Sequence, residues 1–164
     1  MANTSVYTGA DGSISLSTPE GVEGQAAQGI IDANDLVSVG RAQGVSVEVS
    51  SDLKAYHEIG SRYAAELRPG NVTVTGSIKR AYVNGALLKL LLGEAADTRP
   101  QGNWAQPAFN MSLLVENVSQ PGVRNTVTLH GVKFNNWNYE IPEDDFVMEG
   151  AEFQALSITV GDEA

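Results

Sequence analysis

Residues 71–93, NVTVTGSIKRAYVNGALLKLLLG, constrain the fold of this chain more than any other stretch. Val72, Val74 and Ile78 alternate with polar residues, which is the period-two pattern of a half-buried strand. The run 86–92 that follows is apolar except for one lysine. Because a helix that is apolar nearly all round needs cover on most sides, the stretch predicts a strand and a short helix inside a larger core.

Three residues in this stretch suggest where the backbone turns. Gly76 indicates a bulge or a close approach of another backbone. Asn84 can cap a helix at about 84–92 by accepting a hydrogen bond from an unpaired amide. Gly93 can adopt the left-handed conformation that ends such a helix.

Alternating patterns recur along the rest of the chain. They predict further strands at 44–49, 111–118, 125–134, 136–141 and within 146–160. Residues 51–70 predict a short strand to Ile59 and then a loop closed by Pro69 and Gly70. The expected fold is mainly β: an antiparallel β-sandwich or barrel of seven or eight strands with one short flanking α-helix.

The 164 residues are the size of one domain, and no linker or repeat divides them. We expect a single domain over 1–164. Its first part, 1–40, is rich in Gly, Ser and Thr and predicts a loop-rich N-terminal arm. The β-sandwich core is expected over 44–160.

The charge is large and unevenly placed. The formal net charge is -10, with six acids and one base in residues 1–50, and eight acids and no base in 136–164. The middle, 51–135, holds nine bases and six acids. This balance argues against binding nucleic acid through phosphates. It leaves two interpretations open, a solvated surface or acidic surfaces of one copy meeting a basic band of the next.

No motif in the chain indicates catalysis, and we expect no catalytic residue, metal or cofactor. There is no cysteine, and His57 and His130 lack companions at metal-ligand spacing. The acidic run 143–145 lacks the spacing of a calcium loop. Trp104, in a Gly- and Pro-containing loop, is a candidate contact residue. No apolar run is long enough to span a membrane, and the N-terminus predicts no secretory signal.

Two stretches together resemble bacteriophage tail tube proteins. They are 66–93, ELRPGNVTVTGSIKRAYVNGALLKLLLG, and 128–158, TLHGVKFNNWNYEIPEDDFVMEGAEFQALSI. The shared features are a Pro-Gly turn, a strand, a leucine-rich helix and a late block that carries Gly-Val-Lys-Phe, a tryptophan and an acidic turn. The direct match covers about a third of the chain, and its order and spacing extend over 44–160.

The resemblance implies a structural virion protein with this chain itself as its main partner. Copies would form hexameric rings whose sheets join around a lumen, and the rings would stack into the tail tube through which DNA passes without specific binding. Sheath, tape measure, baseplate and terminator proteins are the other implied partners. The protein would be made in the host bacterial cytoplasm and end in the virion tail.

The chain offers candidate contacts between copies and a candidate lumen wall. We expect the polar face of strand 71–83 and that of a second long strand to line the lumen. The interface between subunits or rings is expected to use two bases, three helix leucines and three loop acids. These are Lys79, Arg80, Leu87, Leu88, Leu91, Glu143, Asp144 and Asp145.

Two other functions remain open at this point. The same fold is implied for the inner tube of a contractile injection particle, such as a tailocin or a secretion apparatus. A different class is a monomeric β-sandwich that binds a glycan or another small ligand through Trp104 and the acidic turn. An enzyme is the least favoured alternative.

Overall fold

The computed structural model describes residues 5–163, which form seven strands and two α-helices. The strands are β1 Gly12–Ser17, β2 Ala42–His57, β3 Ala64–Ala81, β4 Phe109–Glu116, β5 Arg124–Glu140, β6 Met148–Ala155 and β7 Ser157–Glu163. The helices are α1 Val22–Ala33 and α2 Ala86–Leu92, and two short 3-10 helices lie at Gly9–Asp11 and Gly93–Ala96.

All strand pairs between these elements are antiparallel, and they form two sheets that share β5. Sheet A consists of β1, β4, the first half of β5 and β7, whereas sheet B consists of the second half of β5, β6, β3 and β2. β5 changes sheets at Gly131, whose φ of 65° suits a residue without a side chain. At the matching corner between β6 and β7, the amide of Leu156 donates to the carbonyl of His130.

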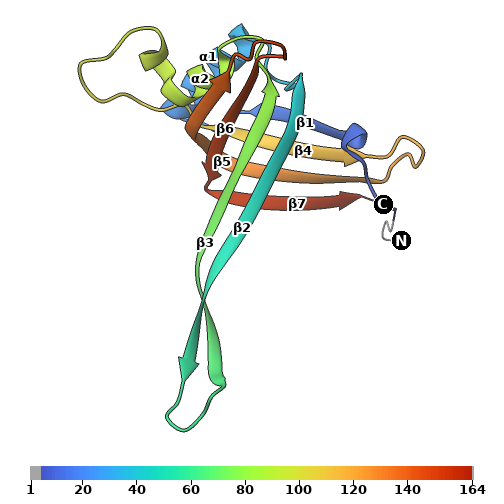
Figure 1. Cartoon of the computed structure of the whole chain (residues 1–164), viewed down its shortest axis with the longest axis vertical. Coiled ribbons are helices and arrows are strands. Elements are labelled where there is room, and N and C mark those ends of the chain that lie inside the picture. Colours follow the sequence, from blue (N-terminus) through green and yellow to red (C-terminus); the bar gives the residue numbers. More distant parts are fainter. Residues whose placement is uncertain (1–4, 164) are drawn as a thin grey trace.

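The core lies where the two sheets cross. Phe109, Leu129 and Met111 of sheet A meet Phe153 and Phe134 of the β5–β6 region, and all are almost completely buried. The two helices lie together at one end of the sandwich, where α2 contacts β5 and α1 contacts β4 (Figure 1). The fully buried Leu90 belongs to this layer, so α2 finds much of its cover within one copy.

The hairpin of β2 and β3 is much longer than the sheet it belongs to. β6 pairs with β3 only from Val74 to Ala81, so residues 51–72 project as a two-stranded ribbon beyond the sandwich (Figure 1). We call this segment the hairpin arm. A two-stranded hairpin is marginally stable alone in water, so the arm lacks the support that β6 gives to the rest of β3.

The expected fold class is confirmed, with differences in the number and length of elements. The predicted strands 125–134 and 136–141 form one bent strand, β5, and the segment 146–160 holds β6 and the start of β7, which continues to Glu163. The prediction of a loop closed by Pro69 and Gly70 is wrong, because β3 already begins at Ala64. Proline is tolerated there because the strand carries a register shift and an unpaired side.

The prediction of an irregular segment at 1–40 is also corrected, within the described residues. It contains β1 and the 12-residue helix α1, so the chain has two α-helices where one was expected. The small residues that predicted a loop instead allow α1 to pack closely against its neighbours. Ala27 and Ile31 are buried, and a Cβ at Gly24 would lie 1.9 Å from the Pro19 carbonyl oxygen. Packing against α2 and β4 outweighs the weak helix propensity of glycine.

The predicted turning points of 71–93 fall where the sequence indicates. Asn84 Oδ1 accepts a hydrogen bond from the Ala86 amide at 3.1 Å, and Gly93 has a φ of 62° at the end of α2. Gly76 marks a close approach and not a bulge, because β2 and β3 keep their register there. A Cβ at Gly76 would lie 2.2 Å from the Ser46 carbonyl oxygen and 2.6 Å from the buried ring of Phe153.

The Gly76→Ala substitution should therefore destabilise the protomer by about 2 kcal/mol or more, because an overpacked core has to shift. Gly44→Ala is the matched control, since it also lies in a β2–β3 pair but meets nothing within 4 Å. Urea unfolding of both variants measures the difference. Equal midpoints for the two variants would contradict this account of Gly76.

Candidate assembly surfaces

A buried ion pair ties sheet B to the start of α2. Arg80 Nε donates to Glu149 Oε1 at 2.6 Å, and both side chains are almost fully buried. The other carboxylate oxygen accepts the Trp137 indole N–H at 2.9 Å. Arg80 Nη2 also donates to Asn84 Oδ1, the atom that accepts the Ala86 amide at the start of α2. The network joins β3, β6, β5 and α2, so it fixes the position of one end of sheet B.

One face of sheet B is polar and open. The strand registers place Ser46, Ser77, Glu152 and Asn138 on this face, opposite the side that carries the buried phenylalanines. The hydroxyls of Ser46 and Ser77 are 2.9 Å apart and share a hydrogen bond. Lys79 is exposed on the same face.

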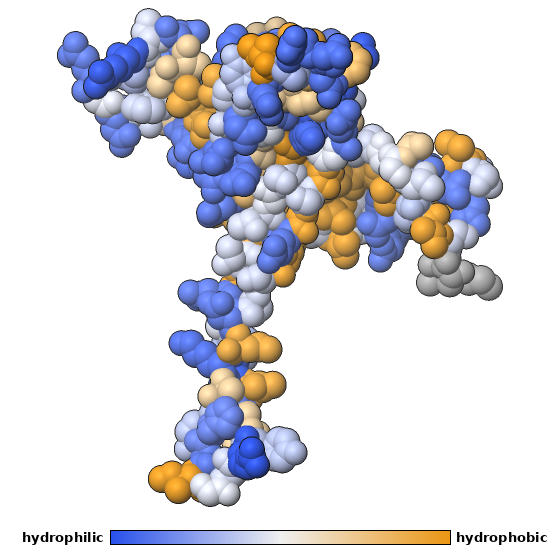
Figure 2. Space-filling view, viewed as in Figure 1, coloured by the Kyte–Doolittle hydropathy of each residue, from blue (hydrophilic) through white to orange (hydrophobic). Residues whose placement is uncertain are grey.

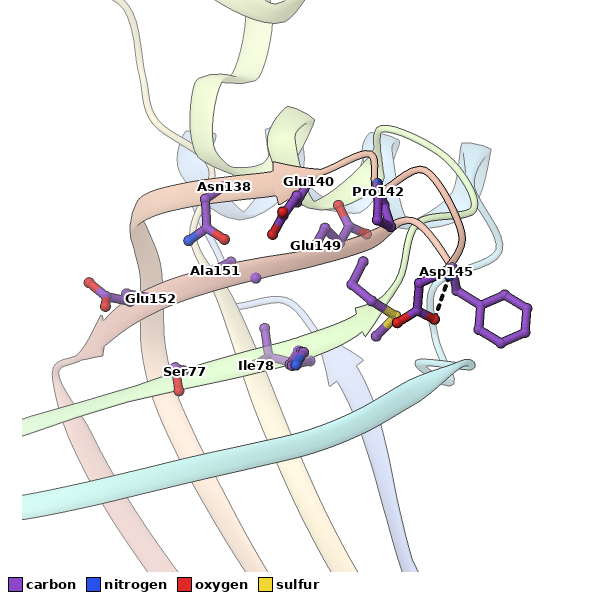
Figure 3. A pocket seen from close by; sticks show the side chains of 13 residues that line it. Ser77, Ile78, Asn138, Glu140, Pro142, Asp145, Glu149, Ala151 and Glu152 are labelled. Carbon is purple, nitrogen blue, oxygen red and sulfur yellow. Dashed lines mark hydrogen bonds between the residues drawn. The ribbon is translucent and has the colours of Figure 1, made fainter.

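A hollow of about 530 Å³ lies at the end of this face, beneath the loop between β5 and β6 (Figure 3). Glu140, Asn138, Glu152 and Asp145 border it, with Ser77 on its floor (Figure 3). In this loop Asp145 Oδ1 accepts the Phe146 amide at 2.7 Å. The hollow therefore continues the polar, mostly acidic character of the open face.

Sheet B has an unpaired edge on each side. In residues 5–163, no strand pairs with the outer side of β2, and β4 reaches β5 only as far as Val132. Gln106 Nε2 caps one β5 carbonyl, that of Phe134, at 2.6 Å. Sheet A differs, because β1 bridges to Ser38 at Ser15 and its edge is partly covered. Sheet B is thus the sheet that further strands can extend in both directions.

The hairpin arm carries one apolar face. Cross-strand partners lie on the same face of a ladder, and the pairs Leu53↔Pro69 and Ala55↔Leu67 follow the core-facing side of sheet B outward. Leu53 and Leu67 are 64% and 62% exposed, and Figure 2 shows apolar surface along the arm. Within residues 5–163, the two leucines on this side of the arm therefore remain largely uncovered.

The opposite end of sheet B carries a second apolar surface. β3 ends at Ala81, and the ladder places this residue beside Met148 and close to Glu140, at the end far from the arm. We call the exposed apolar residues there the head patch. They are Tyr82, Val83, Tyr139, Ile141 and Phe146. The rings of Tyr82 and Tyr139 pack against each other with 5.3 Å between their centroids, and this contact holds the two side chains in place.

The residues predicted from sequence to contact other copies fall into two groups. The first lies at or near the surface: Lys79, Glu143, Asp144 and Asp145 are exposed, and Leu88 and Leu91 are half-buried. The second, Arg80 and Leu87, is buried inside the protomer. We therefore no longer count Arg80 and Leu87 among the surface contacts, and assign them to internal packing.

Sequence reasoning missed the hairpin arm and the acidic partner of Arg80. The alternation of Val45, Val47 and Val49 was visible, but its continuation through Leu53 on the far side of a register shift was not. Glu149 lies 69 residues from Arg80, and no local pattern links the two. Trp104 is 37% exposed in the loop before β4, as its sequence context indicates.

A surface ion pair closes the far end of sheet A. Arg124 Nε donates to Glu163 Oε2 at 2.6 Å between β5 and β7. This hydrogen bond, and then the charge of Glu163, raise the pKa of Arg124 above its ordinary value.

Within residues 5–163, no group of three or more His, Asp and Glu could hold a metal ion. In the same range, no helix has the length and apolar character needed to cross a membrane.

Comparison with known proteins identifies the class of fold. No protein-family model and no curated protein sequence matches the chain. Solved structures do match over nearly the whole length. A chain of the anti-feeding prophage tube-terminating cap aligns with a TM-score of 0.67 and 9% identity, covering 99% of this chain and 95% of that one.

Two further structures show the same likeness. A chain of the sheath-tube complex of an extracellular contractile injection system, PVC, aligns with a TM-score of 0.65 and 10% identity, covering 97% and 93% of the two chains. The SPP1 tail tube aligns with a TM-score of 0.56 and 12% identity, covering 96% and 80%. The chain therefore has the tail-tube fold that its sequence predicted.

Replacing Arg80 tests the buried network. Arg80→Met should lower the free energy of unfolding by about 3–5 kcal/mol, because Glu149 then stays buried without its cation. The double variant Arg80→Met with Glu149→Met should recover most of the loss. Lys79→Met is the matched control and should change stability by less than about 0.5 kcal/mol. Urea unfolding that gave equal losses for Arg80→Met and Lys79→Met would contradict the assignment.

Proposed function

We propose that this protein is the structural subunit of a tail tube, in which hexameric rings stack around a hollow lumen that delivers phage DNA to the host. The observation that carries the proposal is the geometry of sheet B, with unpaired edges on both sides and a hairpin arm at one end. Unpaired edges invite pairing with another chain. Edge-to-edge pairing of β2 with the β5 of a neighbour would continue sheet B around a ring.

The open face of sheet B suits a lumen wall. Besides hydroxyls and amides, this face carries Glu48, Glu140 and Glu152 and the bases Lys79 and Lys133. Lys133 is already paired with Glu23. Like charges repel DNA phosphates over roughly 8 Å at physiological salt, so the acidic wall would not hold the passing DNA. A basic wall would bind it through counterion release instead. This choice of sheet agrees with the expectation that the polar face of 71–83 lines the lumen.

The inner tube of a contractile injection particle is a second proposal within the same architecture. The likeness to chains of the PVC sheath-tube complex and the anti-feeding prophage cap favours it alongside the phage tail. In either case, the partners would be further copies of this chain, followed by sheath, tape measure, baseplate and terminator proteins. The location would be the tail of the particle, after synthesis in the bacterial cytoplasm. The role is structural, without catalysis.

Purified protein should assemble into rings and hollow tubes as its concentration rises. Negative-stain electron microscopy would show hexameric rings end-on and a stain-filled channel along each tube. Size-exclusion chromatography would show a matching shift from monomer to large species. A monomer at all concentrations, in particular one that binds glycans through Trp104, would overturn the proposal.

The position of the lumen can be tested by cysteine labelling, because the chain has no cysteine of its own. Glu48→Cys and Glu152→Cys, both on the open face, should react in assembled tubes with a small maleimide that diffuses along the channel. A maleimide on a large polymer should fail to label them there. The large reagent should label both variants in unassembled protein. Labelling of tubes by the large reagent would show that this face lies outside, and protection from both reagents would place it in a buried interface.

A further inference from the structure

The connection from β3 to α2 holds the only Asn-Gly pair in the chain, Asn84–Gly85. Asparagine is a labile residue, because the backbone nitrogen of the next residue can attack its side-chain carbonyl carbon. Glycine hinders that attack least, since it has no Cβ. A Cβ at Gly85 would meet only the Tyr82 hydroxyl, at 3.9 Å, so neighbouring groups leave room around this residue. The pair therefore has the chemistry of a deamidation site.

Deamidation of this pair needs only water as a co-reactant. The Gly85 nitrogen forms a bond to Asn84 Cγ while the Cγ–Nδ2 bond breaks, and ammonia leaves with the proton of the Gly85 amide. Water then opens the resulting succinimide ring at one of its two carbonyls. Opening at one carbonyl gives aspartate. Opening at the other gives isoaspartate, in which the main chain runs through Cγ and is one methylene longer.

The leaving nitrogen of Asn84 faces water. Nδ2 takes part in no hydrogen bond among residues 5–163. In this part of the chain, no side-chain nitrogen or oxygen is buried without a hydrogen-bond partner, so Nδ2 is exposed. Ammonia can therefore leave, and water can reach the ring that forms.

The other groups of the reaction are held by hydrogen bonds. Asn84 Oδ1 accepts one from Arg80 Nη2 and one from the Ala86 amide, both at 3.1 Å. The Gly85 carbonyl accepts the Lys89 amide at 2.9 Å. Ring closure requires the Asn84 side chain and the Gly85 peptide to rotate until Cγ meets the Gly85 nitrogen, and these bonds resist both rotations. The reaction therefore needs local opening of the connection, which costs free energy in the native state.

The restraint on Asn84 depends on a distant part of the chain. Arg80 Nε donates to Glu149 Oε1 at 2.6 Å, and Glu149 lies on β6, 69 residues further along. The Arg80 guanidinium is therefore held beside Asn84 only when β6 is packed against β3. Asn84 is thus restrained in the native fold and released wherever that packing is absent.

We propose that Asn84–Gly85 is a site of spontaneous deamidation that the buried network protects in the native fold and exposes whenever the network opens. The isoaspartate product lengthens the main chain directly before α2, whose Leu87 and Leu90 are almost fully buried. A chain that reacts before it folds then cannot place this helix as the native chain does. The site therefore marks chains that fold late or unfold, whether or not the protein forms a tube.

Peptide mapping provides the test. The full chain is incubated in mildly alkaline buffer at physiological temperature, in its native state and in guanidinium chloride. Tryptic digestion gives the peptide 81–89, AYVNGALLK, in which Asn84 is the sole side-chain amide. Mass spectrometry detects the product as a peptide one mass unit heavier, and chromatography separates aspartate from isoaspartate. Conversion in the native state should be at least about tenfold slower than in guanidinium chloride, because it waits for local opening.

Two variants examine the parts of the site. Arg80→Met with Glu149→Met removes the guanidinium, and its native state should deamidate at least about threefold faster than the wild type, since Oδ1 loses a charge-assisted hydrogen bond. Lys79→Met is the matched control and should react as the wild type does. Gly85→Ala fits the native fold, and in guanidinium chloride it should react at least about tenfold more slowly, because its Cβ hinders the attack.

Each outcome decides one part of the proposal. No conversion of Asn84 in denatured protein would overturn the site itself, and equal rates in native and denatured wild type would refute protection by the fold. If the double methionine variant has a native circular dichroism spectrum but reacts no faster than the wild type, Arg80 plays no part. Slow native conversion that the double variant accelerates supports the proposal. Tube formation enters none of these measurements, so the proposed function is tested separately.

Discussion

The two sheets of this protein share one strand and cross, so neither can cover the whole apolar face of the other. β5 passes from sheet A to sheet B at Gly131, and the chain turns the same corner again at Leu156. Cover is complete at the crossing, where Phe109 and Phe153 are buried, and decreases outward to Val160, which is 68% exposed. The apolar surface left over and the unpaired edges of sheet B are places where another chain can pack or pair.

The charges of the chain divide between internal and external roles. Arg80 and Glu149 satisfy each other inside the protomer, where the ion pair specifies how β3, β6 and α2 meet. An ion pair buried so deeply contributes little net stability compared with apolar packing, so its use here is in fixing the geometry of one end of sheet B. The exposed acids of loop 143–145 lie at that same end of sheet B, in the connection from β5 to β6. The network around Arg80 thus fixes the end of sheet B that carries loop 143–145, whose acids form no ion pair among residues 5–163.

The sequence predicted the local features well and the long-range ones poorly. The alternation through Val72 and Val74 and the glycine at 93 each act within a few residues, and each was confirmed. The N-cap of α2 is Gly85, one residue after the predicted Asn84, although Asn84 Oδ1 does accept the Ala86 amide. The partner of Arg80 lies 69 residues away, and nothing in a local pattern could identify it. Helix α1 was missed because Gly24 and Gly29 are typical of a loop, and packing outweighs their weak helix propensity. The hairpin arm was missed because its apolar residues have no core to face in the protomer.

The marginal stability of the arm links its folding to the binding of another chain. Residues 51–72 form a ladder of only two strands, with Leu53 and Leu67 exposed and Lys54 opposed to Arg68. Such a hairpin gains little from folding alone, and any chain that binds only its ordered form stabilises that form by mass action. The free energy of any such binding must therefore also supply the cost of ordering the arm.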